Sequence, residues 1–312
     1  MVCQFLGNNI KLLRLGAAEE LLNILIQYAI KRVTTLKTVK RMVTKTEALY
    51  NALLPKKVVN FNDIIEKASG IIKAAPNRRY IYRKYVNRLI ENGKLQRIRK
   101  GLYIVLSPLE EPEKHVVDKL LIASKIRDDY YLGFHTALEY YGSASSLYNE
   151  AYVCVQTSDR FDPFKYKRFS FKPVFVKDVR FEVEEKHYQN STVKVSSKER
   201  TFTECIDRVQ YAGGWEECIK SLQGLGGLNL EKLLTLLHKY RNDNLYRRTG
   251  YVLELLKKRS PFYEHVDDQL LNEIQGHVKG PPRYLINREK GTLQRRWKLY
   301  IPEGFEEKLR GI

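Results

Sequence analysis

The sequence predicts an α+β protein with two domains, a small amino-terminal one of three helices and a β-hairpin followed by a larger α+β one. Three observations support this fold class. Between residues 42 and 107, helical and strand patterns follow one another in the order of a winged helix-turn-helix. Basic side chains concentrate in that same segment. Residues 108–312 alternate between helical periodicity and short runs of β type.

The charge of the chain is strongly positive and unevenly distributed. Its 312 residues carry 55 Lys and Arg against 36 Asp and Glu, a net charge of +19. Residues 42–107 hold 14 basic and 4 acidic side chains, whereas residues 108–312 hold 34 and 30. This excess indicates a polyanionic partner, nucleic acid or an anionic membrane surface, and places the contact in the first half of the chain. The 4 cysteines have no CxxC spacing, which argues against a disulfide framework or a structural zinc site.

Residues 1–41 precede the small domain as an extension. The stretch from Ile10 to Ile30 is apolar but contains four charged side chains, too many for a membrane span, and no signal-peptide cleavage site follows it. Leucines at helical spacing predict one amphipathic helix here. The alternative is dispensable sequence, because a well-formed domain opens directly after Met42. We expect a cytoplasmic protein that engages no membrane.

The first two helices of the small domain are predicted from their start and stop signals. Thr44 and Glu47 have the spacing of a capping box, and the helix that they open stops at Pro55. After a short extended piece, Asn62 or Asp63 is expected to cap the second helix, which continues to about residue 72.

The third helix and the hairpin complete the predicted winged helix-turn-helix. The helix runs from about Arg79 to Glu91 and ends at Gly93, a typical left-handed stop. Two alternating strands follow, 95–98 and 102–106, joined by a turn at Lys100 and Gly101.

The side chains of the third helix divide into two faces. An apolar stripe suits packing on the first two helices, and a polar face carries Arg, Lys, Asn and Tyr. Arg can read guanine and Asn can read adenine in a major groove, whereas Tyr and Lys reach phosphate. The alternative is a solvated basic face in a protein–protein module. The candidate DNA-binding residues of this helix and the hairpin are Arg78, Arg79, Tyr80, Arg83, Lys84, Asn87, Arg88, Lys94, Arg97, Arg99 and Lys100.

The larger domain, residues 108–312, is predicted as a mixture of helices and strands. Strands are expected at 151–157, 168–176, a stretch through 181–195, 283–286 and 297–301. Helices are expected at 113–126, in the short segment 134–142, and at 199–209, 214–222, 230–240 and 244–259.

Three blocks of the chain, in order, resemble the AbiEi antitoxins, transcriptional regulators of type IV (abortive-infection) toxin–antitoxin systems. The hairpin from Lys94 to Tyr103 resembles that family's wing, and Phe134–Gly142 resembles its short helix. Ser197–Arg208, followed by Ala212–Glu217, resembles its Arg-Thr…Asp block and Gly-Gly helix start. The resemblance covers about Met42 to Ile301.

This resemblance implies a winged helix that binds inverted repeats upstream of its own operon and represses it. It also implies that the second domain, as the antitoxin part, counters a nucleotidyltransferase toxin without requiring a stable complex. The role in DNA contact transfers to the third helix and the wing, whereas no antitoxin residue transfers. Arg200 and Thr201 are as well explained by a helix start, since Thr201 and Glu204 have capping-box spacing, and Asp207 by a structural partner.

Motifs for catalysis, cofactors and metals do not stand out in the sequence. Gly224–Asn229 is similar to a dinucleotide loop but has Asn229 in place of the third glycine. The six histidines are scattered without HxxxH or HExxH spacing, and His135 is expected to be a core or edge residue of its helix and not a ligand. We therefore predict no catalytic residue, no cofactor, no metal site and no enzymatic activity.

The leading hypothesis is a double-stranded-DNA-binding repressor that acts as an antitoxin. The first alternative is a winged-helix transcription factor whose second domain senses a small ligand and has no toxin partner. The second is an enzyme that acts on DNA, which would need clustered carboxylates near a basic face that has only four acidic residues. The oligomeric state stays open, a dimer on DNA included.

Overall fold

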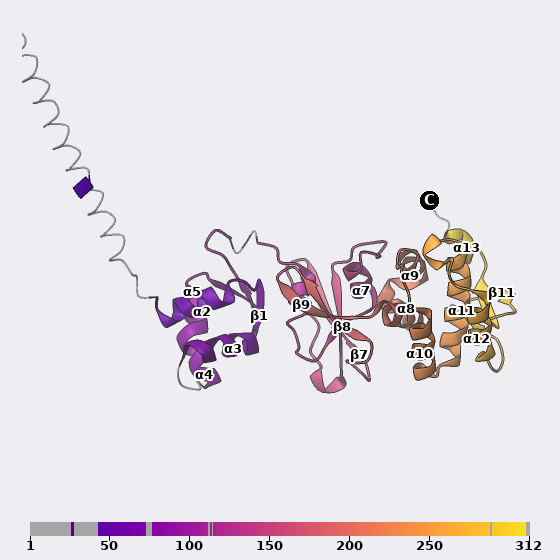
Figure 1. Ribbon diagram of the computed structural model, residues 1–312, viewed down its shortest axis with the longest axis horizontal. Coiled ribbons are helices and arrows are strands. Elements are labelled where there is room, and N and C mark those ends of the chain that lie inside the picture. The colour runs from indigo at the N-terminus through magenta and orange to yellow at the C-terminus, as the bar shows by residue number, and fades with distance from the viewer. Residues whose placement is uncertain are drawn as a thin grey trace, which may run out of the picture. The chain divides into compact units, whose positions relative to one another are not determined.

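The computed structural model describes residues 26–27, 43–72, 77–111, 113, 115–287 and 289–309 (Figure 1). By its contacts the chain falls into two compact units, Met1–Ala48 and Leu49–Ile312. The described residues combine helices with three sheets, so the predicted α+β class is confirmed. The predicted extension lies outside the described residues, apart from 26 and 27. Within the part described, no helix is both long and apolar enough to cross a membrane.

The first helix, α2 (Lys45–Leu53), begins where the sequence predicts. Thr44 precedes it, and its Oγ1 accepts a hydrogen bond from the backbone amide of Glu47 at 3.2 Å. This bond satisfies one of the amides that a helix start leaves without an internal acceptor.

The second helix, α3 (Phe61–Ile71), begins earlier than predicted. Its cap is Asn60, so the expected cap at Asn62 or Asp63 is wrong. The Asn60 side chain accepts from the Asp63 amide at 2.8 Å, and the Asp63 carboxylate accepts from the Asn60 amide at 3.0 Å. The helix starts here because the backbone amide of Phe61 already donates to the carbonyl of Gly101 in the hairpin turn.

The third helix is continuous but not uniform. It consists of α4 (Arg78–Ile81), a π-helical turn η1 (Tyr82–Val86) and α5 (Asn87–Glu91). The Asn77 side chain caps its start by accepting from the backbone amide of Arg79. Gly93, with φ +66°, ends it in the left-handed conformation that the sequence predicts.

The small sheet has both faces buried. Its strands β1 (Val58–Asn60), β2 (Leu95–Arg99) and β3 (Leu102–Val105) lie in the order β1-β3-β2 and are antiparallel. One face packs in the core of helices α2 to α5 through Val59, Tyr103 and Val105. The other face packs in a core shared with residues 117–195, through Val58, Leu102 and Ile104. Side chains from both sides of the predicted boundary at 107/108 therefore share one hydrophobic cluster.

A mixed sheet of six strands forms the centre of the region after residue 108, and its order is β6-β7-β5-β4-β9-β8. The outer pairs are antiparallel, whereas β5 with β7 and β4 with β9 are parallel. The strands are β4 (Tyr131–Leu132), β5 (Glu150–Val155), β6 (Phe164–Tyr166), β7 (Phe169–Phe175), β8 (Val183–Tyr188) and β9 (Ser191–Ser196).

Side chains alternate between the two faces of this sheet. Val153 and Val155 belong to the cluster shared with α6 (Lys119–Ala123) and the small sheet. Cys154 belongs to the cluster of α7 (Phe134–Tyr140) and the later helices. The helix predicted at 113–126 is much shorter than expected, because Asp118 caps α6 and starts it only at residue 119.

The remaining helices pack together on the α7 side of the sheet (Figure 1). They are α8 (Lys198–Asp207), α9 (Gly214–Gln223), α10 (Leu230–Tyr240), α11 (Asp243–Lys257), α12 (Asp268–Gly276) and α13 (Phe305–Lys308). Single turns η2, η3 and η4 lie at Thr157–Asp159, Val209–Ala212 and Pro261–Tyr263. A second three-stranded sheet, in the order β10-β12-β11, is formed by β10 (Arg283–Tyr284), β11 (Gly291–Gln294) and β12 (Leu299–Pro302).

The start of α8 corrects one prediction. Ser197 is its cap and accepts from the backbone amide of Arg200 at 3.2 Å, so a capping box of Thr201 with Glu204 is wrong. Thr201 lies inside the helix, and its hydroxyl donates back to the carbonyl of Ser197 at 2.8 Å.

Candidate nucleic-acid interface

The third helix is anchored by one apolar face. Ile81, Tyr85, Val86 and Leu89 are buried in the core of the small helical region. The π-helical turn puts two neighbouring residues, Tyr85 and Val86, into this core together. Such turns occur preferentially at functional positions of helices.

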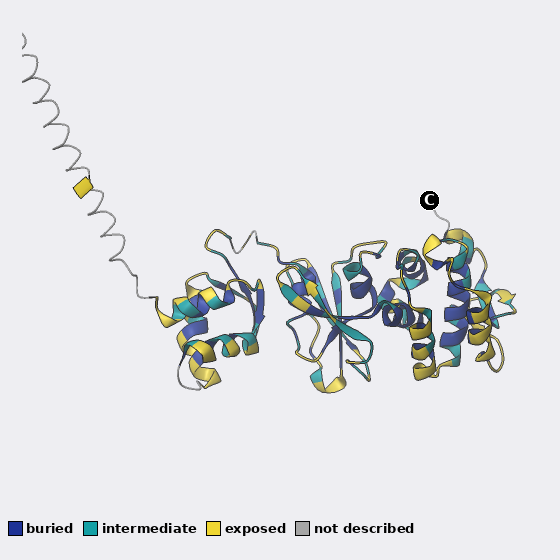
Figure 2. Ribbon diagram, in the orientation of Figure 1, coloured by how far each residue is buried: buried dark blue, intermediate teal, exposed yellow. Residues whose placement is uncertain are grey.

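The opposite face of the helix carries cations without protein partners. Much of the start of this helix, α4, is exposed (Figure 2). Arg79, Arg83 and Arg88 of the helix are exposed, as are Arg97 and Lys100 on the hairpin. In the described part of the chain, none of these five side chains has a hydrogen bond or an ion pair. A cation with no partner stays available for an anionic ligand.

Tyr80 and Lys84 form a pair on this face. The ammonium of Lys84 donates to the hydroxyl of Tyr80 at 2.9 Å, and this contact raises the pKa of Lys84. Tyr80 is 43% exposed and packs edge-on against Tyr85, with ring centroids 6.0 Å apart. Asn87, the remaining polar residue of the face, is half-buried.

Three of the predicted site residues lie against aromatic rings and do not belong to the group of unpartnered cations. Arg78 lies over the ring of Phe61 at 5.0 Å and donates to the Asn62 side chain. Lys94 lies 4.5 Å from the ring centroid of Tyr50 in α2, and Arg99 lies 4.6 Å from that of Phe164 in the six-stranded sheet.

Arg99 differs most from the exposed group. Its side chain is half-buried, and burial together with the charge of Arg127 lowers the pKa of its guanidinium. Arg97 and Lys100, the other hairpin cations, are therefore exposed like the arginines of the third helix, whereas Arg99 points toward the six-stranded sheet.

Two of the four acidic residues of segment 42–107 form ion pairs away from the exposed cations of the third helix. Asp63 forms ion pairs with Lys56 at 2.9 Å and Lys125 at 3.1 Å, and Glu66 pairs with Lys67 at 3.1 Å. These carboxylates neutralise lysines on α3 and its surroundings. Glu91 is the one acidic residue of the third helix and forms no ion pair among the described contacts, so the helix keeps a positive net charge.

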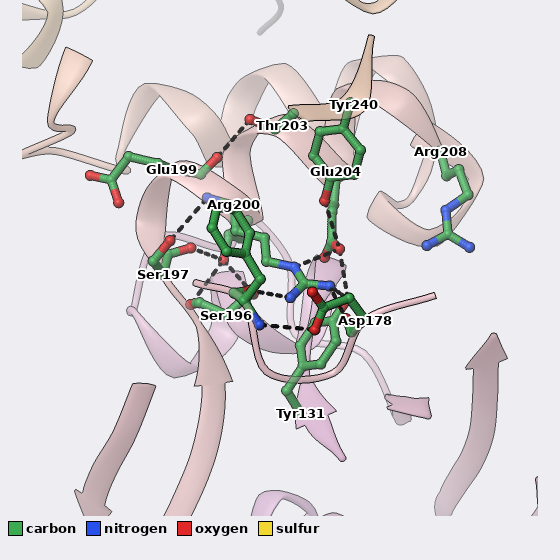
Figure 3. Close-up of polar contacts among 12 residues, drawn as sticks. Tyr131, Asp178, Ser196, Ser197, Glu199, Arg200, Thr203, Glu204, Arg208 and Tyr240 are labelled. Carbon is green, nitrogen blue, oxygen red and sulfur yellow. Dashed lines mark hydrogen bonds and ion pairs between the residues drawn. The ribbon is translucent and has the colours of Figure 1, made fainter. Parts of the chain in front are cut away.

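The larger region contains a buried polar cluster around Arg200 (Figure 3). Its guanidinium donates to Glu204 at 2.9 Å, to the Tyr131 hydroxyl at 2.7 Å and to the Asp178 carbonyl at 2.8 Å, and it also donates to the carbonyl of Phe181. Burial disfavours the charge, but Glu204 and Tyr131 outweigh it, so the pKa of Arg200 lies above its usual value. This arrangement ties α8 to the sheet and to the loop after β7.

His135 and Asp207 also have structural partners. His135 is buried between Glu139 and Glu217, with a distance of 3.2 Å from one ring nitrogen to each carboxylate, and it stacks on Tyr148. Asp207 accepts from the Asn242 side chain at 3.2 Å, and burial raises its pKa. Among the described residues, no group of three or more His, Cys, Asp or Glu side chains could hold a metal ion.

Sequence reasoning missed the residues that position the face. Asn77 was not predicted as the cap of the third helix, and Phe61 and Asn62 were not predicted to hold Arg78. An Asn directly before a basic helical stretch is the local signal that could have identified the cap. The contacts of Arg78 join residues about 16 positions apart, and no local signal predicts them.

No protein-family model and no curated protein matches the chain. Among solved structures, the chain is similar to the crystal structure of the Rv2827c protein from Mycobacterium tuberculosis, with a TM-score of 0.56 and 14% sequence identity. The match covers 86% of this chain and 95% of that one. At this identity the similarity shows a common fold, which extends over most of the chain.

Proposed function

We propose that the chain is a DNA-binding transcriptional repressor and that residues 42–107 act as a winged helix-turn-helix. The observation that carries this proposal is the exposed face of the third helix. Arg79, Arg83 and Arg88 have no hydrogen bond or ion pair within the described residues, whereas Asp63 and Glu66 pair with lysines elsewhere. Unpaired cations on one helix face suit the phosphates of a duplex, because binding there releases condensed counterions. The local net charge of +10 in this segment supports the same conclusion.

The helix would enter the major groove and the hairpin would follow the backbone. Arg83 and Asn87 are the residues that we assign to base reading, because Arg suits guanine and Asn suits adenine. Arg79, Arg88 and Lys100 are assigned to phosphates. We expect Arg99 to contribute less to DNA binding than the exposed cations, because its guanidinium lies against the ring of Phe164.

We further propose that the protein is the antitoxin of a type IV toxin–antitoxin system. In this proposal it binds inverted repeats upstream of its own operon and counters a nucleotidyltransferase toxin. The support is the ordered resemblance to the AbiEi antitoxins. The near balance of charge after residue 108 also supports it, since DNA binding alone does not account for so large a region.

The DNA-binding proposal is tested with the full-length protein, because the small sheet shares its core with the larger one. Affinity for a duplex from upstream of the gene is measured by fluorescence anisotropy over a salt series. Lys100→Ala should weaken all duplexes alike and make the slope of log K against log salt less negative by about 0.9. Asn87→Ala should cost about 1–3 kcal/mol on the operator only.

Arg295→Ala is the matched control, an exposed arginine of the carboxy-terminal region outside the proposed interface. It should leave both affinity and slope unchanged. Salt-independent binding, or equal losses in Arg295→Ala and Lys100→Ala, would refute the interface. If Asn87→Ala loses the same affinity on every duplex, the helix does not read bases.

The antitoxin proposal is tested by growth rescue in cells that express the cognate nucleotidyltransferase. A full-length variant that carries Arg83→Ala and Asn87→Ala should lose operator binding but still rescue growth, because the region after residue 108 is intact. Loss of rescue in step with loss of DNA binding would mean that neutralisation is only repression of the toxin gene.

A ligand-sensing transcription factor is the second candidate, and one cavity favours it. The cavity has a volume of about 360 Å³ and lies beside α8, with Phe181, Arg200, Glu204, Lys239 and Tyr240 among its lining residues. Under this alternative, a small molecule would change operator affinity and no neighbouring toxin would exist. The presence of a nucleotidyltransferase gene beside this one separates the two candidates.

A further inference from the structure

Two histidines that are distant in the sequence meet at the surface of the carboxy-terminal helices. His238 lies in α10, and His277 follows the last residue of α12. Their Nε2 atoms are 3.2 Å apart, and both side chains are exposed. None of the ordinary metal-binding spacings joins these residues, so the pair could not be predicted from the sequence.

The pair is held in place from beneath by a buried tyrosine of α11. The ring of Tyr246 stacks on His277, with centroids 4.7 Å apart and planes 17° apart, and it lies 6.2 Å from the ring of His238. Tyr246 is only 5% exposed and belongs to the main core. The imidazoles are thus backed by a fixed surface, and their Nε2 atoms face each other at hydrogen-bond distance.

We propose that His238 and His277 form a binding site for a borderline transition-metal ion of the Zn²⁺, Cu²⁺, Ni²⁺ or Co²⁺ class. Zinc binds imidazole nitrogen at about 2.0–2.1 Å. Two nitrogens 3.2 Å apart then subtend an angle of about 99–106° at the metal, close to the tetrahedral value. The separation is already that of two ligands of one ion, and binding would replace the hydrogen bond between the rings by turning both nitrogen lone pairs toward the metal.

The donor set determines which ions fit. Two neutral imidazoles favour late first-row metals and disfavour Mg²⁺ and Ca²⁺, which prefer oxygen. Because no third His, Cys, Asp or Glu joins the pair within the described chain, water fills the remaining positions. The site is therefore a labile one, occupied according to the supply of metal, and not one on which folding depends.

Metal binding at this pair would connect two helices. Leu233 and Leu237 of α10 pack in the same hydrophobic cluster as Leu271 and Ile274 of α12. An ion held by His238 of α10 and by His277, the residue directly after α12, would link the two helices a second time. It would bind only the folded protein, in which the two histidines are close together. Occupancy should therefore stabilise the chain against unfolding.

The experiment measures thermal unfolding of the full-length protein, stripped with a chelator, in the presence of ZnCl₂ or MgCl₂. Zinc should raise the midpoint by several degrees with one ion bound per chain in calorimetry, and magnesium should have no effect. His238→Ala and His277→Ala should each abolish the zinc shift. His265→Ala, an exposed histidine outside the pair, is the matched control and should retain it.

Cu²⁺ gives a second readout that does not depend on stability. The electron paramagnetic resonance spectrum of one bound Cu²⁺ should show two nitrogen ligands in the wild type and at most one in His238→Ala. Zinc affinity should also fall as the pH is lowered, because protons compete for the same nitrogens. An unchanged zinc shift in both alanine variants, or no zinc binding by the wild type, would overturn the proposal.

Discussion

Replacing Arg200 with methionine is expected to destabilise the protein strongly. Arg200 is 3% exposed, and its guanidinium serves Glu204, Tyr131 and two backbone carbonyls. Methionine fills much of the same volume but provides no donor. The variant would leave the carboxylate of Glu204 buried without its cation.

The magnitude follows from this uncompensated charge. Removing one partner of a buried ion pair costs about 3–5 kcal/mol, a large part of the roughly 5–15 kcal/mol that stabilises a typical domain. Urea unfolding of the full-length chain, followed by circular dichroism, measures the loss. The matched control is Lys220→Met, which removes the half-buried partner of the exposed Glu216 at the same spacing of four residues. That change should cost no more than about 0.5 kcal/mol.

A double variant separates the ion pair from simple loss of packing. Arg200→Met combined with Glu204→Leu should regain part of the lost free energy, because no buried charge is left alone. If Arg200→Met costs less than about 1 kcal/mol and yet abolishes growth rescue, Arg200 contacts a partner and the structural role argued from Figure 3 is wrong.

Two further predictions concern packing and pH. Gly250→Ala should destabilise the chain by about 1–3 kcal/mol in urea unfolding, because its Cβ would lie 2.1 Å from the ring of Trp297. Gly70→Ala, also in a helix but with nothing within 4 Å of its Cβ, should instead stabilise by up to about 1 kcal/mol, and a loss there would contradict the steric argument. The backbone hydrogen bond from Arg180 is the main cause that lowers the pKa of Asp178 to about 2, so this carboxylate stabilises the fold above its unfolded pKa of about 3.8, and the contribution disappears as the pH falls toward 2. Since the side chain is 46% exposed, the contribution should be about 1 kcal/mol or less, and Asp178→Asn should flatten stability between these pH values; an unaltered pH profile would refute it.

Local signals in the sequence predicted the helices best. The helix at Leu230–Tyr240 has the predicted bounds because Asn229 caps it, and Gly93 ends the third helix as expected. The helix predicted at 113–126 extends only over Lys119–Ala123, because Asp118 caps it there. Val117 is buried, whereas the neighbouring Val116 is 54% exposed.

Elements that depend on distant partners could not be predicted. The strands β6 and β11 and the helix α12 were all missed, the strands being only three and four residues long. The π-helical turn was missed because its extra residue is accommodated by the packing of the core, which no helical periodicity in the sequence reveals.

The candidate interface shows the same division between local and distant information. Helical spacing placed Arg83 and Arg88 on one face, and the structure has both exposed. The alternation of the hairpin strands did not predict that Arg99 turns toward Phe164. That residue is 65 positions away, and its ring packs against the hydrophobic cluster that the two sheets share.

The partners of the arginines, more than their number, indicate what each part of the chain does. Arg247 is fully buried and donates to Asp243 at 2.8 Å and to the Lys298 carbonyl at 3.0 Å. Its guanidinium, like that of Arg200, therefore binds partners within the fold. Such arginines cannot bind an outside ligand without breaking the core. Arg79, Arg83 and Arg88 of the third helix are exposed and have no ion pair within the described residues, so a phosphate can bind them without displacing a protein partner. This difference is why we propose the DNA contact on that helix and give Arg200 and Arg247 a structural role.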